Sequence, residues 1–220
     1  LLANMLMTQG KFEQAKRHCV ALNGNTSLLT ASTCVLDVQS QQGKLSESYH
    51  ALVKLTQNKN SSLATKHVLS EMAFRLNKFT RAQQHINNID LNTAPVSLIV
   101  LWADIQLQQN NPEKVLNTLG KLANSHSSLE DAILLKLAIA EKRSNKHTNT
   151  VWQPLMQQRV KLREQRQDTF HANDLANYYI HVQANQAKAQ YWANINWQQA
   201  KMSTDKHLLS QANTMVRDSL

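Results

Sequence analysis

A segment of similar design recurs every 33 or 34 residues along the first half of the chain. Four motifs mark it, QGKFEQA, QGKLSES, LNKFTRA and QNNPEKV, which begin at residues 9, 42, 76 and 109. The second place in these motifs is held by Gly10, Gly43, Asn77 and Asn110, at spacings of 33, 34 and 33 residues. Gly and Asn tolerate the left-handed backbone that ends a helix. Because segments of helical periodicity flank each motif, the sequence predicts a series of units, each made of a helix, a tight turn and a second helix.

The residues that follow each turn support this prediction. An apolar side chain stands two positions later in three units, and a small side chain stands three positions further on. These positions hold Phe12, Leu45 and Phe79, and then Ala15, Ser48 and Ala82. Small side chains let two helices approach closely. The fourth unit has Pro112 and Val115 instead, and proline is favoured as the first residue of a new helix.

Helical periodicity and the turn residues together predict thirteen helices. They span residues 1–9, 12–23, 28–42, 45–58, 62–76, 79–90, 95–109, 112–125, 129–144, 151–167, 171–184, 187–200 and 205–218. Ser and Thr, which favour the N-cap position, recur between the units. They are Thr26 and Ser27, Ser61 and Ser62, and Ser127 and Ser128, the last pair followed by Asp131 in a capping-box arrangement.

The composition excludes several classes of protein. Four Gly and three Pro in 220 residues are far below the roughly 7% and 5% of an average protein, which disfavours turn-rich β architectures. The 42% of apolar residues can form a continuous core, but the apolar runs are shorter than the ~18 to 20 residues of a membrane-spanning helix. We therefore expect a soluble, all-α protein without a transmembrane segment.

The period, the turn glycine, the aromatic residue two positions on and the alanine after it resemble the tetratricopeptide repeat. The resemblance covers residues 1 to about 125. It implies a right-handed superhelical stack of antiparallel helix hairpins, which is an α-solenoid. Residues 168–200 are similar to the C-terminal unit of some secreted bacterial tetratricopeptide proteins, whereas residues 144–167 match the repeat poorly. The matching residues of that unit are His171, Asn173, Asp174, Leu175, Ala176, Ala187, Ala189, Ala193, Asn196 and Trp197.

The same resemblance predicts how the chain is organised. Residues 1–145 are expected to form the repeat array, with a truncated first repeat. Residues 146–220 are expected to form a C-terminal hairpin and a capping helix that continue the array. Since Leu1 falls inside the first helix of a repeat, further residues are expected upstream. The resemblance also favours a periplasmic or envelope-associated location over a cytoplasmic one.

In tetratricopeptide proteins the first helix of each unit lines a concave surface that commonly binds a peptide or an extended segment of another protein. By this resemblance, Asp37, Glu71 and Asp104 occupy equivalent positions of successive first helices. They would form an acidic ladder that engages Lys, Arg or amide groups of a partner. The neighbouring concave positions are Thr33, His67, Phe74, Arg75, Val100 and Gln108. The alternative is that the three acids are solvated polar positions of amphipathic helices.

No motif for catalysis, metal binding or cofactor binding is found in the sequence. The nine histidines are not part of an HExxH motif, a close cluster of Cys and His, or a bracketing pair of carboxylates. The motifs GxGxxG and GxSxG are missing, as is a phosphate-binding P-loop. We therefore expect no catalytic residues, no metal site, no cofactor and no enzymatic activity.

Two further features allow more than one interpretation. Cys19 and Cys34 lie in adjacent predicted helices, and we expect two buried free thiols, with a disulfide as the alternative if the chain is exported. The segment RVKLREQR places Arg159, Arg163 and Arg166 along one helical face, with Lys161 elsewhere. A solvated face is expected there, and an anionic surface or partner is the alternative.

These observations predict a non-enzymatic scaffold that binds a peptide or protein segment on its concave surface and takes part in assembling an envelope complex. The net charge of +9 supports an alternative, a nucleic-acid-binding helical repeat. Nucleic acid is the less expected partner because the charge is dispersed. Residues 1–145 carry 15 basic and 10 acidic side chains, and residues 146–220 carry 9 and 5. Self-association through the edges of the stack is a third prediction, and the sequence leaves the partner's identity and the oligomeric state open.

Overall fold

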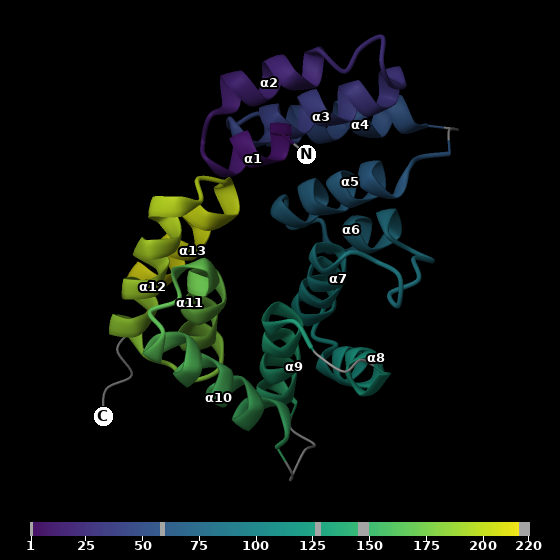
Figure 1. The fold of residues 1–220 in the computed structure, drawn as a ribbon. Helices are drawn as coiled ribbons and strands as arrows, with labels where there is room; N and C mark the ends of the chain where they lie inside the picture. Colours follow the sequence, from purple (N-terminus) through teal and green to yellow (C-terminus); the bar gives the residue numbers. More distant parts are fainter. Residues whose placement is uncertain (1, 58–59, 126–128, 145–149, 216–220) are drawn as a thin grey trace. The chain divides into compact units, whose positions relative to one another are not determined.

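The computed structural model describes residues 2–57, 60–125, 129–144 and 150–215. Within these residues it contains thirteen α-helices, one 3-10 helix and no strand, which confirms the all-α class (Figure 1). The helices are α1 (Leu2–Thr8), α2 (Phe12–Val20), α3 (Leu28–Gln41), α4 (Leu45–Thr56), α5 (Leu63–Arg75), α6 (Phe79–His85), α7 (Val96–Gln108), α8 (Pro112–Ser125), α9 (Asp131–Arg143), α10 (Trp152–Gln165), η1 (Thr169–His171), α11 (Ala172–His181), α12 (Gln186–Gln199) and α13 (Ser203–Thr214).

Each predicted segment contains one α-helix, and the main differences concern where helices end. Helix α2 ends at Val20 instead of residue 23. Helix α6 ends at His85 instead of residue 90, because Ile86 leaves helical geometry and Asn88 takes the left-handed conformation at φ 65°. Residues 1, 58 and 216–218 of the predicted helices lie outside the described part of the chain.

The four turn residues all adopt the left-handed backbone that the repeat predicts. Their φ angles are 74° at Gly10, 92° at Gly43, 57° at Asn77 and 59° at Asn110. In each turn the next N–H group donates to the carbonyl five residues earlier, as Lys78 does to Ala73 at 2.9 Å. Gly10 is constrained further, since a Cβ atom built there would lie 2.9 Å from Cβ of Lys201, whereas open space surrounds the same position at Gly43.

The chain divides into two compact units. The first comprises residues 1–89 together with residues 200–203, and the second comprises residues 90–199 and 204–220. In the first unit, consecutive helices from α1 to α6 pack on one another, and α3 also contacts α1 and α5. In the second unit, α9 packs on α8 and α10 and also contacts α7 and α11. The boundary predicted between residues 145 and 146 lies outside the described residues.

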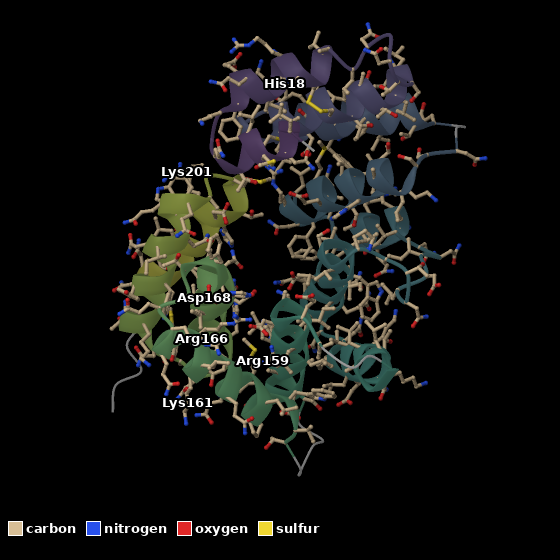
Figure 2. All side chains as sticks on the ribbon, in the orientation of Figure 1. His18, Arg159, Lys161, Arg166, Asp168 and Lys201 are labelled. Atoms are coloured by element: carbon tan, nitrogen blue, oxygen red, sulfur yellow. A yellow bond between two sulfur atoms is a disulfide. The ribbon has the colours of Figure 1, made fainter. Side chains whose placement is uncertain are left out.

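A disulfide joins Cys19 of α2 to Cys34 of α3, so the expectation of two free thiols is wrong. Figure 2 shows the bridge near His18. The two α-carbons are 5.4 Å apart, because α2 and α3 pack directly on each other. The alternative stated for an exported chain is therefore the one that the structure contains.

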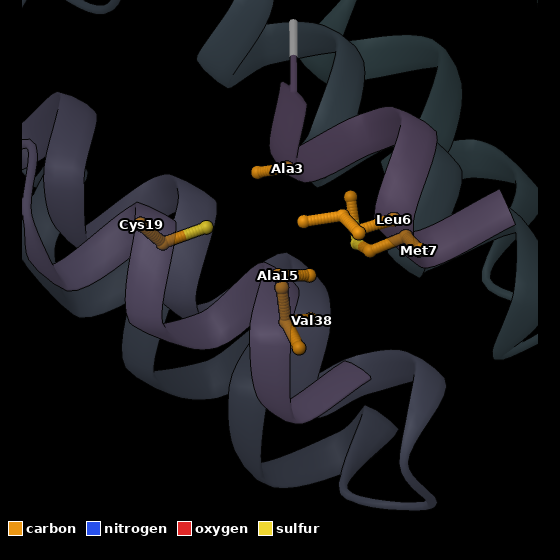
Figure 3. Close-up of a cluster of buried hydrophobic side chains, with 6 residues drawn as sticks. All are labelled: Ala3, Leu6, Met7, Ala15, Cys19 and Val38. Atoms are coloured by element: carbon orange, nitrogen blue, oxygen red, sulfur yellow. The ribbon is translucent and has the colours of Figure 1, made fainter. Parts of the chain in front are cut away.

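The core of the first unit forms where small residues let its helices approach. Ala3, Leu6 and Met7 of α1 point towards Ala15 and Cys19 of α2 and towards Val38 of α3 (Figure 3). The equivalent small residues of the next two units, Ser48 and Ala82, are also buried. The Ser70 hydroxyl donates to the carbonyl of Ala82 at 2.9 Å, which is possible only when α5 and α6 lie close together.

Two of the three predicted helix starts have the expected cap. The side chains of Ser27 and Ser62 accept hydrogen bonds from the backbone N–H groups of Thr30 and Thr65. The third prediction is wrong for Asp131, because α9 begins at Asp131 itself and Glu130 is its N-cap. Asp131 therefore cannot be the third residue of a capping box, and Ser127 and Ser128 lie outside the described residues.

Candidate functional site

Six of the nine predicted partner-binding residues lie on α3 and α5, two helices of the first unit that contact each other. Thr33 and Asp37 come from α3, and His67, Glu71, Phe74 and Arg75 come from α5. We call these six residues together with Ser40 the polar face of α3 and α5. Helical spacing explains why they share it: Asp37 follows Thr33 by four residues, and Glu71 follows His67 by four and precedes Arg75 by four.

Several of these side chains form hydrogen bonds or ion pairs with other residues of the first unit. The hydroxyls of Thr33 and Thr65 are 3.2 Å apart and form a buried hydrogen bond. Arg75 donates to the Ser40 hydroxyl at 2.9 Å and to the Ser40 carbonyl at 2.8 Å. Its guanidinium also lies 3.8 Å from the Glu71 carboxylate. Arg75 and Thr33 therefore connect neighbouring hairpins, a role that the sequence did not predict.

The electrostatics of the polar face centre on Asp37. Burial, together with repulsion from the Glu71 carboxylate, raises the pKa of Asp37 to about 7 against the opposing effect of Arg75. Burial also lowers the pKa of His67 below its usual value, although Glu71 opposes this. Near neutral pH Asp37 is therefore only partly ionised. Its protonated form can donate a hydrogen bond to a ligand, and its carboxylate form can accept one.

The apolar member of this face is Phe74, which is half-buried. Its ring lies 5.5 Å from that of Phe79, centroid to centroid, at the start of α6. Aromatic pairs at this separation attract each other and hold both rings in place. The polar face thus combines one aromatic side chain with titratable groups, which suits contacts with a peptide.

The other three predicted residues lie on α7 in the second unit. The Asp104 carboxylate forms an ion pair with Lys136 of α9, whose Nζ lies 2.7 Å from Oδ1 of Asp104. Lys136 is itself buried. Val100 is half-buried and Gln108 is exposed. Glu71 and Asp104 thus each face a cation of their own unit, so they are neither fully solvated acids nor acids without a counter-charge.

A charged network that the sequence did not predict joins α9, α10 and η1. The buried carboxylate of Asp131 accepts from Arg159 and from Arg163, both at 2.9 Å. Arg163 also donates to Asp168 at 2.9 Å, and Asp168 lies 3.0 Å from Nδ1 of His171. One signal was available in the sequence. A run as apolar as DAILLKLAIAE can bury its three charged residues only if each finds a partner.

The last residue of that run, Glu141, holds the start of α10. Its buried carboxylate accepts the backbone N–H groups of Val151 at 2.7 Å, Trp152 at 3.1 Å and Gln153 at 2.8 Å. The first N–H groups of a helix have no partner within the helix, and a negative charge there also interacts favourably with the helix dipole. A residue of α9 therefore caps α10.

These contacts change the interpretation of the basic segment 159–166. Arg159 and Arg163 pair with Asp131 and Asp168, so they do not form the solvated face that was expected. Lys161 and Arg166 are exposed (Figure 2). The local excess of positive charge is therefore smaller than the sequence suggests.

The first unit also carries an apolar hollow, which we call the α2–α4 groove. It measures about 310 Å³ and opens to solvent. Its wall consists of one face of α3, the end of α2 with the following turn, and the second half of α4. The lining residues are Val20, Asn23, Leu28, Ala31, Ser32, Val35, Leu36, Ala51 and Leu55.

Two general properties bear on the kind of site that this chain can form. Among the described residues, no group of three or more His, Cys, Asp or Glu side chains is arranged to hold a metal ion. No helix in the described ranges combines the length and apolar character needed to cross a lipid bilayer.

No model of a known protein family, no curated protein and no solved structure matches the chain.

Proposed function

We propose that the chain is a non-enzymatic scaffold whose helix hairpins stack into a tetratricopeptide-like superhelix and bind a peptide or protein segment. The observation that carries the proposal is the pairing of α3 with α5. Equivalent helices of successive units touch each other and bring Asp37, His67 and Glu71 onto one face. In a stack of repeats, such a face is extended and can hold an extended chain.

The proposal extends to the predicted surroundings of the protein. The Cys19–Cys34 disulfide supports an oxidising compartment, such as the periplasm, because disulfides seldom persist in a reducing cytosol. Assembly of an envelope complex is the corresponding biological role. Nucleic-acid binding finds less support, because acidic partners already occupy two of the three arginines of segment 159–166.

Affinity capture with substitutions on the polar face tests this function. The chain is immobilised, exposed to native extract, and the retained proteins are identified by mass spectrometry. Neutralising Asp37→Asn with Glu71→Gln should reduce the recovery of specific partners, because each substitution removes the carboxylate charge and one of the two acceptor oxygens available to their Lys, Arg or amide groups. Glu47→Gln, on α4, and Glu130→Gln, at the N-cap of α9, change exposed carboxylates outside α3 and α5 and should retain recovery.

Before the capture experiment, thermal melting followed by circular dichroism establishes that each immobilised variant is folded. Equal recovery by the polar-face variant and by the two controls would remove the polar face from the binding surface. Titration with oligonucleotides over a salt series addresses the other class of partner, since phosphate-driven binding weakens steeply as salt rises.

A further inference from the structure

The α2–α4 groove is a surface of large exposed apolar side chains. Leu28 is 69% exposed, Val20 is 55% exposed and Leu55 is 37% exposed. They come from three different helices and line the same hollow together with Val35 and Ala51. Single exposed apolar residues are ordinary, but a contiguous group that lines one concavity is typical of an interaction site.

Helix α2 ends at the edge of this groove. It has 9 residues, compared with 12 in α4, 14 in α8 and 7 in α6. The sequence predicts three more helical residues after Val20, which would add about 4.5 Å of helix over the first half of α3. Instead, residues 22–26 fold into turns closed on the Leu22 carbonyl, which accepts from the N–H groups of Asn25 and Thr26. The groove thus lies where α2 gives way to these turns, since Val20 and Asn23 both line it.

The size of the groove fits a few apolar side chains. Its volume of about 310 Å³ is twice the ~150 Å³ of a cavity that accommodates benzene. Since it is open on one side, the occupant can extend beyond it. Two apolar side chains from one face of a helix would fill this volume, and the rest of the helix could extend past the open side. This is the helix-in-groove mode of recognition.

Basic residues adjoin the apolar lining. Arg17 and Lys16 precede Val20 by three and four residues on α2, so they lie on the same side of that helix. Lys54 follows Ala51 by three residues on α4 and is exposed. Glu47 is the one acid at a corresponding spacing from Ala51 among the described residues of α4. Lys16, Arg17 and Lys54 thus compare with Glu47 and with Glu13, which lies a further turn from Val20 on α2. This excess of basic residues favours an occupant with acidic residues beside its apolar ones.

The disulfide holds two walls of the groove together. Cys19 directly precedes Val20, and Cys34 directly precedes Val35. The bridge thus fixes the end of α2 to the middle of α3 beside the lining residues. A preformed groove loses less conformational entropy on binding than one that must be ordered by its ligand.

From these observations we propose that the α2–α4 groove docks an acidic amphipathic helix of a partner protein. Leu28, Val20 and Leu55 receive its apolar residues, spaced three or four apart. Arg17 and Lys54 face its Glu or Asp side chains. This surface is separate from the polar face of α3 and α5, so the two proposals can fail independently.

Fluorescence anisotropy with synthetic peptides and the intact chain tests the proposal. The probe is a labelled 18-residue helical peptide with Leu at positions spaced three and four apart and Glu beside them. One control peptide has Lys in place of every Glu, and another has two central prolines. The acidic peptide should bind, and both controls should bind at least about tenfold more weakly, because charge and helical shape each contribute on the order of 1 kcal/mol or more.

A matched pair of variants locates the binding site on the chain. Leu28 and Leu63 are both exposed and each is the first residue of a helix capped by serine. Leu28→Asp should weaken the acidic peptide about tenfold or more, since it places a charge in an apolar contact, and Leu63→Asp should leave its affinity unchanged. Reducing the disulfide should weaken binding to a smaller extent.

Several results would overturn the proposal. They are no binding of the acidic peptide, equal binding of the acidic and basic peptides, and equal effects of Leu28→Asp and Leu63→Asp. Two others assign the groove to a different occupant: a dimer in sedimentation equilibrium that Leu28→Asp dissociates, or binding to phosphatidylglycerol vesicles that Leu28→Asp abolishes. Each of them leaves capture through the polar face to its own test with Asp37 and Glu71.

Discussion

Arg75 of α5 donates to both the hydroxyl and the backbone carbonyl of Ser40 on α3, at 2.9 and 2.8 Å. The sequence places Arg75 on a binding surface, but two of its N–H groups already join neighbouring hairpins. A lysine at this position cannot make the same two-pronged contact, because its ammonium is a single point of charge.

Arg75→Lys should therefore lower the free energy of unfolding by about 1 to 3 kcal/mol, the range for hydrogen bonds that involve a charged group. Urea unfolding followed by circular dichroism measures this difference. Arg81→Lys is the matched control, since Arg81 is exposed and its hydrogen bond within the described part of the chain goes to Gln84 of the same helix. Equal stability of the two variants would show that the Arg75–Ser40 contact does not stabilise the fold.

The raised pKa of Asp37 predicts a pH dependence of stability. The pKa is about 7 in the folded protein and 3.8 ordinarily, so between these values the folded state keeps a proton that the unfolded state has lost. This contribution to stability is complete below pH 3.8 and is lost as pH rises through 7. Asp37→Asn should therefore be more stable than the wild type at pH 8, and the difference should shrink at pH 5.

Urea unfolding of both proteins at pH 5 and pH 8 tests this sign. Asp90→Asn is a suitable control, because hydrogen bonds from Asn92 lower the pKa of Asp90 below 3.8. Above pH 5 the Asp90 carboxyl is ionised in both the folded and the unfolded state. The Asp90→Asn variant should therefore show the same difference in stability between pH 5 and pH 8 as the wild type. An Asp37→Asn variant with the wild-type pH slope would contradict the raised pKa.

Glu141 should be needed for the first turn of α10. Replacing it with Gln keeps the size of the side chain but removes one acceptor oxygen and the negative charge, while three backbone N–H groups require acceptors. We expect Glu141→Gln to cost about 1 to 3 kcal/mol of stability. Hydrogen exchange of the amides of residues 151–153 should accelerate more than that of the middle of α10.

Glu130→Gln provides the comparison for Glu141. Glu130 is the N-cap of α9, but its exposed side chain makes no capping hydrogen bond. It should therefore change neither global stability nor the exchange of residues 151–153. If both variants behaved alike, the carboxylate of Glu141 would not be what stabilises the start of α10.

Ala82 tests the close approach of helices that the repeat predicts. Its side chain is fully buried, and its carbonyl accepts from Ser70 of the facing helix. Ala82→Leu adds three carbons to this contact and should cost about 1 to 3 kcal/mol through overpacking. Thr80→Leu, at an exposed position of the same helix, should change the melting temperature little. Equal melting of the two variants would contradict the predicted register of α6.

The helices and the turns between them could be predicted because their causes are local. The left-handed conformation at Gly10, Gly43, Asn77 and Asn110 follows from residues that tolerate it, and Ser27 and Ser62 cap the helices that follow them. The lack of such a local signal explains one error. The predicted helix extends to residue 167, but α10 ends at Gln165 and Gln167 adopts φ 50°. Glutamine does not favour this conformation, so the sequence did not indicate the turn.

The candidate site could be predicted only in part, because its character depends on contacts between helices. The repeat places Asp37 and Glu71 on helices that touch, but it does not show that Arg75 binds Ser40 or that burial changes the pKa of Asp37. The α2–α4 groove was missed for a related reason. It adjoins the end of α2 at Val20, which comes three residues before the predicted end.

Equivalent positions of a repeat need not accept the same substitutions. Asn already serves as the turn residue at 77 and 110, and a Cβ atom added at Gly43 would meet open space, so the backbone conformation alone limits replacement there. At Gly10 an added Cβ atom would lie only 2.9 Å from Cβ of Lys201, so one of the two would have to shift. The period specifies the backbone conformation of a turn, whereas the distant segment that lies against that turn decides which side chains evolution or design can use at it.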